Sequence, residues 1–327
     1  METLIRQARP SDANGILMLL NQVFGDQQKS TIKRNLQFYH WKFLNSIYGK
    51  SYLVVAESNN KLIGVANLWP WDLYFNSKII KALQPCDSAV HPDARGKGIF
   101  KKIRANGIQF AKENEYSLLF NFPNTQSIDA YLSLGWTNIG KISWWIKIID
   151  PINIAKGVFN NEKSEPAQIP DDYTLNAKQL DQLATKCRSQ ESQISIHKME
   201  GFHEYRYMSH PFRKYGAIQY RANGLIGVLI FTINQKGKLR EMVIVDYIGS
   251  NRIINNCIKK SIRDARHLNI DMIAVMSNSI FDINLMKLGF IKRKNKNMVV
   301  MPLNSGLQHI VNDYNNWDMV ASLHDSI

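Results

Sequence analysis

Apolar residues along the first half of the chain recur with two different periods. Alternating or continuous apolar runs predict strands, and apolar positions three or four residues apart predict amphipathic helices. A break in the apolar pattern is expected near Pro70. The expected strands are residues 3–8, 51–58, 61–69, 73–90, 116–122 and 142–148, and the expected helices are residues 10–24, 35–45, 100–114 and 127–134.

The order of these elements indicates the fold class. One strand is followed by two helices and three strands, and then by a helix, a strand, a helix and a last strand. This order predicts an α/β domain, in which helices cover both faces of a mixed sheet.

The second half of the chain repeats features of the first half. YHWKFLNSIYGK (39–50) is echoed by EYRYMSHPFRKY (204–215), and residues 117–136 align with residues 271–290 at a constant offset of 154. Two tandem copies of one α/β fold are therefore expected. The stretch between them loses its periodicity and gathers Pro, Asn, Lys and Glu, as linkers do. The expected division is a first domain at 1–150, a linker at 151–172, a second domain at 173–303 and a C-terminal tail at 304–327.

Composition agrees with two globular domains and adds a preference for anions. The chain has 327 residues, of which 45% are hydrophobic, enough for two cores. Its formal charge of +14 arises from 41 Lys and Arg against 27 Asp and Glu, spread along the sequence. Such a balance favours anionic ligands, including phosphates, nucleotides and nucleic acid.

Cysteine usage and hydropathy indicate the compartment. Cys86, Cys187 and Cys257 are far apart and form no CxxC pair, so neither a zinc ribbon nor a disulfide framework is expected. The N-terminus lacks secretory features, and no apolar run approaches the roughly 18 residues that span a bilayer. We therefore expect a soluble cytoplasmic protein without a membrane span.

The loop between the strand 73–90 and the helix 100–114 is a candidate anion site. Gly96 and Gly98 flank Lys97, and a glycine-containing turn at a helix N-terminus points successive backbone N–H groups at one place. The stretch has neither the GxxxxGK[ST] spacing of a P-loop nor the pattern of a dinucleotide fold. Taken alone, the loop fits either a phosphate site or a tight strand-to-helix turn.

A second motif follows the buried strand 116–122. Asn124, Ser127, Tyr131 and the pair Gly135-Trp136 stand at fixed spacings after it. Together with the loop, this motif resembles the GNAT superfamily of acyl-CoA-dependent N-acyltransferases. The signature of that family is Arg/Gln-x-x-Gly-x-Gly/Ala, followed by an Asn…Ala…Tyr…Gly-Phe helix. Arg95-x-x-Gly98-x-Phe100 matches all but the last position, where Phe100 replaces a small residue.

The resemblance implies an acyl-CoA site, with acetyl-CoA as the expected cofactor. The backbone N–H groups of Gly96 to Ile99 would hold the pyrophosphate, and the pantetheine arm would follow Asp87 to Val90. Asn124 would fix either the cofactor or the entry of its helix. The cofactor-binding residues implied are Ser88, Ala89, Val90, Arg95, Gly96, Lys97, Gly98, Ile99, Phe100, Asn124 and Ser127.

Two residues are candidates for the proton transfers. The resemblance makes Tyr131 the general acid, since a phenol with a pKa of about 10 suits a thiolate whose conjugate acid has a pKa of about 8.5. Asp87 could accept the proton of the amine, or could serve as a structural acceptor. His197, Glu200 and His203 have helical spacing, but an amphipathic helix face explains it and no metal site is expected.

The second copy is expected to have lost the chemistry. Leu285 takes the place of Tyr131, and the glycine loop shrinks to residues 249–252. This copy is expected to line the substrate pocket without binding CoA.

The function expected from the resemblance is transfer of an acetyl group from CoA to the primary amine of a small molecule, directly in a ternary complex. Similar duplicated proteins accompany bacterial surface-polysaccharide synthesis, so a nucleotide-linked amino sugar is the first candidate acceptor, and no nucleic-acid partner is expected. One alternative is a tRNA-dependent aminoacyl transferase on a related double fold, which should lack the intact CoA loop. Another is a non-catalytic acyl-CoA sensor. The oligomeric state stays open.

Overall fold

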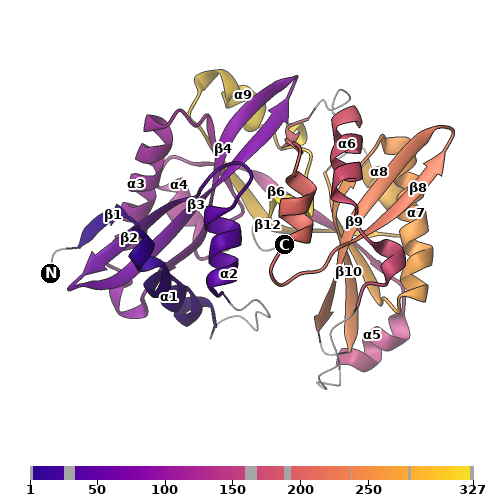
Figure 1. The fold of residues 1–327 in the computed structure, drawn as a ribbon, viewed down its shortest axis with the longest axis horizontal. Helices are drawn as coiled ribbons and strands as arrows, with labels where there is room; N and C mark the ends of the chain where they lie inside the picture. The colour runs from indigo at the N-terminus through magenta and orange to yellow at the C-terminus, as the bar shows by residue number, and fades with distance from the viewer. Residues whose placement is uncertain are drawn as a thin grey trace. The chain divides into compact units, whose positions relative to one another are not determined.

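A computed structural model describes residues 3–25, 34–158, 168–187, 193–236, 238–278 and 281–324. The chain divides into two compact units (Figure 1). The first, here called the N-terminal unit, consists of Met1–Gly140, His210–Phe212 and Asn297–Tyr314. The C-terminal unit consists of Lys141–Ser209, Arg213–Lys296 and Asn315–Ile327. Both units combine helices with strands of a mixed sheet, so the predicted α/β class is confirmed.

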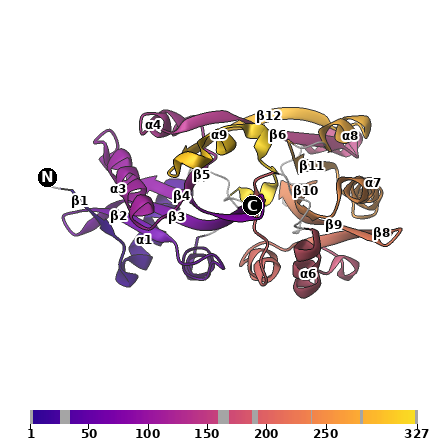
Figure 2. The ribbon, with the colours of Figure 1, turned by 90° about the horizontal axis from the view of Figure 1, so that it is seen from above.

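The sheet of the N-terminal unit has the strand order β1-β2-β3-β4-β5-β12. Its neighbours are antiparallel except for β4 and β5, which run parallel. Figure 2 shows α3 and α4 on one side of these strands and α1 and α2 on the other. The strands are β1 (Leu4–Gln7), β2 (Tyr52–Ser58), β3 (Lys61–Phe75), β4 (Lys78–Val90), β5 (Leu118–Asn121) and β12 (Ile291–Pro302), and the helices are α1 (Ala13–Gly25), α2 (Leu36–Tyr39), α3 (Ile99–Glu113) and α4 (Ile128–Leu132).

Helix α3 lies close against the sheet because two glycines leave room for it. A Cβ on Gly107 would stand 2.7 Å from the side chain of Leu68, and one on Gly64 would stand 2.7 Å from Ile103. The apolar face of α3 thereby joins a core that also contains Tyr131 and Trp136. Since packed interiors have few voids, this contact fixes how α3 lies against β3.

The break predicted near Pro70 is wrong. Strand β3 runs through Pro70, which pairs with Leu83 of β4. Pro70 lies beyond Leu68, the last residue of β3 that pairs with β2, so its missing N–H breaks no β2–β3 bond. The chain turns instead at Asn76 and Ser77, whose φ angles of 46° and 62° suit a type I′ hairpin.

The C-terminal unit repeats this sequence of elements. Its strand order is β6-β11-β10-β9-β8, and β10 and β11 run parallel as β4 and β5 do. An antiparallel meander is again followed by a long helix, a buried strand and a short helix. The elements are β6 (Thr137–Ile148), α5 (Pro151–Val158), α6 (Ala177–Cys187), β7 (Ser195–Ile196), β8 (Gly216–Ala222), β9 (Leu225–Lys236), β10 (Leu239–Ile248), α7 (Asn251–His267), β11 (Met272–Met276) and α8 (Phe281–Lys287).

The last strand from the first half of the sequence pairs in the C-terminal unit, and the last strand from the second half pairs in the N-terminal unit. Strand β6 follows α4 in sequence but pairs with β11, and β12 follows α8 but pairs with β5. Residues 141–150, expected in the first domain, therefore lie in the C-terminal unit. Of the expected linker 151–172, residues 151–158 form α5, and residues 159–167 lie outside the described residues.

The tail expected at 304–327 is packed as far as residue 324, where its description ends. Helix α9 (Gln308–Val311) and three short 3₁₀ turns follow β12. Trp317, Ala321 and Leu323 are fully buried. Among the helices of the described ranges, none combines the length and the hydropathy that crossing a bilayer requires.

Candidate active site

The glycine loop enters α3 with a left-handed backbone at both glycines. Gly96 has a φ of 76° and Gly98, the N-cap of α3, has a φ of 70°. A Cβ built on either residue would meet nothing within 4 Å, so the backbone angle, and not crowding, requires glycine there. The space beside these residues lets an anion approach the first N–H groups of the helix.

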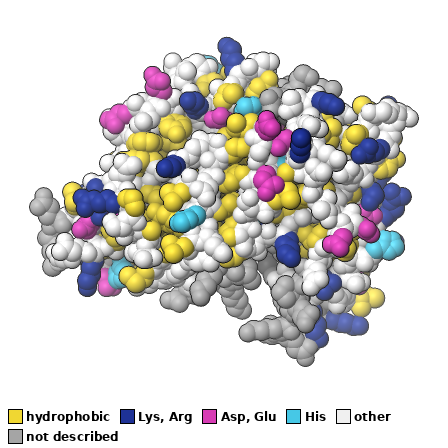
Figure 3. Space-filling view, viewed as in Figure 1, with side chains coloured by type: hydrophobic (Ala, Val, Ile, Leu, Met, Phe, Trp, Pro, Cys, Tyr) yellow, Lys and Arg dark blue, Asp and Glu magenta, His cyan; other side chains and the backbone are white. Residues whose placement is uncertain are grey.

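Cations surround this helix end. Arg95, Lys97, Lys101 and Lys102 are all exposed. Lys97 Nζ donates to Asp93 O over 3.0 Å, which keeps the side chain beside the loop. Cations oppose the positive end of the helix dipole, and a bound anion would offset that repulsion. Elsewhere on the surface, Lys and Arg side chains occupy many separate positions on the face drawn in Figure 3.

Strands β4 and β5 separate just before this loop. Their parallel pairing covers only Ala82–Leu118 and Leu83–Leu119, after which β4 continues to Val90. The β3–β4 register shifts between Val65 and Asn67, which marks a β-bulge. At the bulge, Asp87 has a φ of 41°, an uncommon value for a residue other than glycine. A bulge with early loss of pairing leaves main-chain groups of β4 to other partners.

Tyr131 of α4 lies at the end of β5. Its side chain is 2% exposed, and its hydroxyl accepts a hydrogen bond of 2.6 Å from Asn121 Nδ2, on the last residue of β5. The ring meets Phe100 and Trp136 edge to face, at centroid distances of 6.2 and 4.9 Å. The aromatic ring that replaces the small residue of the loop signature is thus packed against Tyr131.

Asn124 and Ser127 shape the entry of α4. Asn124 Oδ1 accepts hydrogen bonds from the backbone N–H groups of Gln126 and Ser127 and from the Ser127 hydroxyl. Of the two roles expected for Asn124, the observed bonds correspond to fixing the helix entry.

The sequence of the N-terminal unit matches a known family. Residues 4–139 match the family described as Acetyltransferase (GNAT) domain. These residues form a GNAT domain. No curated protein sequence is significantly similar to the chain.

Solved structures extend the likeness in fold to most of the chain. A GCN5-related N-acetyltransferase from Anabaena variabilis is 15% identical, with a TM-score of 0.66 over 93% of this chain and 73% of that one. A conserved Enterococcus faecalis protein, named as a probable N-acyltransferase, gives a TM-score of 0.67 at 10% identity over the same shares. N-myristoyltransferase of Saccharomyces cerevisiae, solved with bound myristoyl-CoA, gives 0.57 at 11% identity, covering 91% of this chain and 82% of that one.

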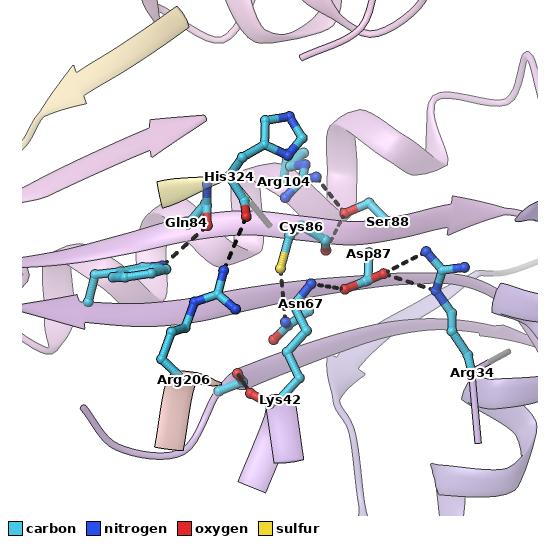
Figure 4. A network of polar contacts seen from close by, with 12 residues as sticks. Arg34, Lys42, Asn67, Gln84, Cys86, Asp87, Ser88, Arg104, Arg206 and His324 are labelled. Atoms are coloured by element: carbon cyan, nitrogen blue, oxygen red, sulfur yellow. Dashed lines mark hydrogen bonds and ion pairs between the residues drawn. The ribbon is translucent and has the colours of Figure 1, made fainter. Parts of the chain in front are cut away.

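Asp87 of the GNAT domain is held by two cations (Figure 4). Lys42 Nζ lies 2.6 Å from Asp87 Oδ2, and Arg34 lies 3.1 Å from Oδ1. Burial raises the pKa of the Asp87 carboxyl, but the nearby Lys42 and Arg34 outweigh burial, and the net pKa lies below its ordinary value. A carboxylate stabilised in this way is a weak proton acceptor near neutral pH.

Ser88, the next residue, contacts the helix that covers the other face of the sheet. Its hydroxyl accepts a hydrogen bond from Arg104 Nη2 of α3, also drawn in Figure 4. Ala89 is buried and Val90 is half-buried. The structure thus brings the predicted residues of β4, the glycine loop and α4 into one region of the GNAT domain.

The sequence prediction missed Lys42, Asn121 and Arg104. Trp41, Lys42 and Phe43 are consecutive and all buried, which a regular helix face does not allow. They lie in a π-helix (His40–Leu44), whose wider turn changes the faces that side chains occupy. Arg104 was detectable, because it interrupts the apolar stripe of α3 four residues after Phe100.

The C-terminal unit lacks two parts of this arrangement. Only residues 249–250 separate β10 from α7, where residues 91–98 separate β4 from α3. Leu285 lines an apolar cavity together with Ile254 and Val275. The C-terminal unit therefore has a shorter connection where the N-terminal unit has the glycine loop, and a leucine where the alignment places Tyr131.

One feature of the GNAT domain has a counterpart in the C-terminal unit. The buried carboxylate of Asp246 lies at a bulge of β10, accepts a hydrogen bond of 2.7 Å from the Tyr207 hydroxyl and pairs with Lys198 at 2.8 Å. Tyr207 belongs to a π-helix (Glu204–Met208), as Lys42 does in the N-terminal unit.

One histidine of the helically spaced trio, His203, has a carboxylate partner. His203 Nδ1 pairs with Asp181 Oδ1 at 2.5 Å, and the same carboxylate accepts from the backbone N–H of Gly201. No group of three His, Cys, Asp or Glu side chains suited to a metal ion occurs within the described ranges.

Proposed function

We propose that the chain is an acyl-CoA-dependent N-acyltransferase that transfers an acetyl group to the primary amine of a small molecule. The observation that carries the proposal is the pair of left-handed glycines, Gly96 and Gly98, which open the N-terminus of α3 beside the separated strands β4 and β5. The matched GNAT domain and the myristoyl-CoA bound to one structural neighbour support an acyl-CoA donor.

The residues present fit such a donor. A Cβ at either glycine would project into open space, so the loop offers room for a diphosphate without a steric change in the protein. The N–H groups of Gly96 to Ile99 would hold the diphosphate, with Arg95 and Lys97 adding attraction. Acyl-CoA supplies the activated acyl group as a thioester. Backbone N–H groups of Ala89 or Val90, on the bulged end of β4, would donate to the thioester oxygen.

Tyr131 would protonate the departing thiolate. Its oxygen accepts from Asn121, and this bond holds the hydroxyl at the end of β5. Direct transfer in a ternary complex requires no nucleophile from the protein. Cys86 is buried and receives a hydrogen bond from Asn67 on its sulfur, so a covalent route through this thiol is not proposed.

Asp87 was expected to be either the acceptor of the amine's proton or a structural acceptor. This proposal assigns it the structural role. Its carboxylate holds Lys42 and Arg34 on the bulge of β4, and its lowered pKa disfavours proton uptake from an amine. We assign the amine's proton to solvent.

A tandem duplication is part of the proposal. The repeated element order supports it, and so does the pairing of a buried carboxylate at a strand bulge with a π-helix side chain in both units. The aligned stretches 39–50 and 204–215 place Lys42 and Tyr207 at equivalent positions. A nucleotide-linked amino sugar is the first acceptor to test, on the resemblance to polysaccharide-pathway proteins.

Calorimetric titration of acetyl-CoA tests the donor site. Gly98→Val should weaken binding at least tenfold, because it blocks the approach to the N–H groups and strains the left-handed backbone. Gly224→Val is the matched control, since Gly224 has a φ of 74°, equally open space around it and a place in a hairpin of the C-terminal unit. Equal affinities in the two variants, or no binding by the natural chain, would refute the site.

Thiol release with a panel of amines separates the functional alternatives. An N-acyltransferase releases CoA thiol only with an acceptable amine, whereas a sensor binds acyl-CoA without turnover. A tRNA-dependent transferase would show neither acyl-CoA binding nor amine-dependent thiol release.

A further inference from the structure

Arg104 is a buried cation whose hydrogen-bonding capacity is only partly used. Its side chain extends from α3 and the residue is 5% exposed. Nη2 donates to Ser88 Oγ, while the buried Nε and Nη1 have no hydrogen-bond partner in the part of the chain that the structure describes. Buried guanidinium donors are ordinarily satisfied, so two donor nitrogens without a partner on one group point to a ligand.

The aromatic rings beside Arg104 attract its charge but accept no hydrogen bond from its unused donors. The guanidinium carbon lies 5.0 Å from the centroid of the Phe100 ring and 5.2 Å from that of the Tyr131 ring. Aromatic faces attract a cation, but they do not take the place of oxygen acceptors in the guanidinium plane. Burying a charge is favourable only when it is paired or fully hydrogen-bonded.

The position of Arg104 relates its unused donors to the acyl-CoA of the proposed function. Its partner Ser88 lies on β4 beyond Leu83, the last residue of β4 that pairs with β5. Its ring neighbour Tyr131 is the proposed proton donor to the departing thiolate. The unused donors therefore lie where the proposed function places the acyl-carrying arm of the donor.

We propose that Arg104 binds an oxygen of the acyl-CoA between its diphosphate and the end of its acyl group. This inference rests on the proposed function. The required chemistry is an oxygen acceptor, which an amide carbonyl of the pantetheine arm supplies in every CoA ester, and which a terminal carboxylate supplies in a dicarboxylic acyl group. Arg104 is then a substrate-binding residue that either holds the arm or selects the acyl group.

Calorimetric titrations with four ligands test the proposal. Adenosine 3′-phosphate 5′-diphosphate retains the diphosphate but lacks the arm, and CoA, acetyl-CoA and succinyl-CoA add the arm, a neutral acyl group and an anionic one. In Arg104→Met, affinity for the first ligand should be unchanged. If an arm carbonyl is the acceptor, all three CoA ligands should bind at least tenfold more weakly, and if the acyl carboxylate is the acceptor, only succinyl-CoA should.

Controls separate binding from folding. Lys112→Met removes an exposed cation from the opposite end of the same helix and should leave all four affinities as they are in the natural chain. Arg104→Gln, which retains side-chain N–H donors without the charge, replaces Arg104→Met if that variant does not fold. Equal affinities of the variant and the natural chain for all four ligands would overturn the proposal. Failure of the natural chain to bind the first ligand would instead overturn the proposed acyl-CoA site.

Discussion

Asp87 shows how a single side chain holds distant parts of the sequence together. Its carboxylate pairs with Lys42, which is 1% exposed, and with Arg34. Removing one member of a buried ion pair leaves the other charge unpaired, which typically costs about 3 kcal/mol or more. Asp87→Asn should therefore lower the free energy of unfolding at neutral pH by about that amount. Asp93→Asn, at a carboxylate 90% exposed, should change it little.

The effect of Asp87→Asn should depend on pH in a defined direction. The pKa of the folded Asp87 lies below the ordinary 3.8, so its stabilisation is present above pH 3.8 and is lost as the pH falls through the folded value. Urea unfolding should therefore show a difference between variant and natural chain that is full at neutral pH and shrinks in acid below pH 3.8. A difference of constant size across this range would contradict the ion-pair assignment.

Tyr131→Phe separates the proposed role of the Tyr131 hydroxyl as proton donor from the packing of the Tyr131 ring in the core. The ring contacts with Phe100 and Trp136 remain, and only the hydroxyl bonded to Asn121 is lost. Loss of a general acid should lower kcat about 100-fold or more, with a smaller effect on acetyl-CoA affinity. Tyr52→Phe, which removes a hydroxyl bonded to Asn106, is the control and should retain kcat. An unchanged kcat in a rate-limiting chemical step would exclude Tyr131 as the acid.

At the residue scale, the sequence singles out candidate groups whose spacing is local, and it misses groups that only tertiary contacts bring together. Gly98 and Tyr131 lie within recognisable motifs, at a strand-to-helix turn and a short helix. Lys42 and Asp87 are 45 residues apart, and no local period connects them. Arg104 can be recognised in the sequence as a cation within the apolar stripe of its helix, but its unused donors are apparent only in three dimensions.

At the element scale, hydrophobic period predicted the strands and helices better than it predicted their partners. A strand with alternating apolar residues can pair with any sheet edge whose side chains are apolar on the same face. The pattern of β6 therefore does not reveal that it pairs with β11. The same holds for β12. Its residues Val299 to Pro302 pair with Asn121 to Leu118 of β5, which lies far earlier in the sequence. The π-helix at His40–Leu44 escaped detection because its period differs from 3.6.

The pairing of β12 with β5 has a consequence for a shortened chain. Residues 1–150, the domain expected from the sequence, lack β12 and expose the edge of β5, whose four residues are all buried in the full chain. This fragment should unfold without the cooperative transition of the full chain and should aggregate. Circular dichroism during urea titration checks the result. A cooperative fragment that binds acetyl-CoA would contradict the importance of β12.

At the scale of the whole molecule, the two units share an element order but differ in the parts that a donor site needs. The N-terminal unit has the left-handed glycines before α3, whereas residues 249–250 alone connect β10 to α7. One acyl-CoA per chain is therefore expected. The shared element order could be predicted from the sequence, because the aligned stretches 117–136 and 271–290 have apolar residues at matching positions.

A crystal structure of the full chain with bound CoA tests the central claim most directly. One CoA per chain should have its diphosphate on the N–H groups of Gly96 to Ile99 and its thiol beside Tyr131. A diphosphate bound elsewhere, or a second CoA in the C-terminal unit, would contradict the account.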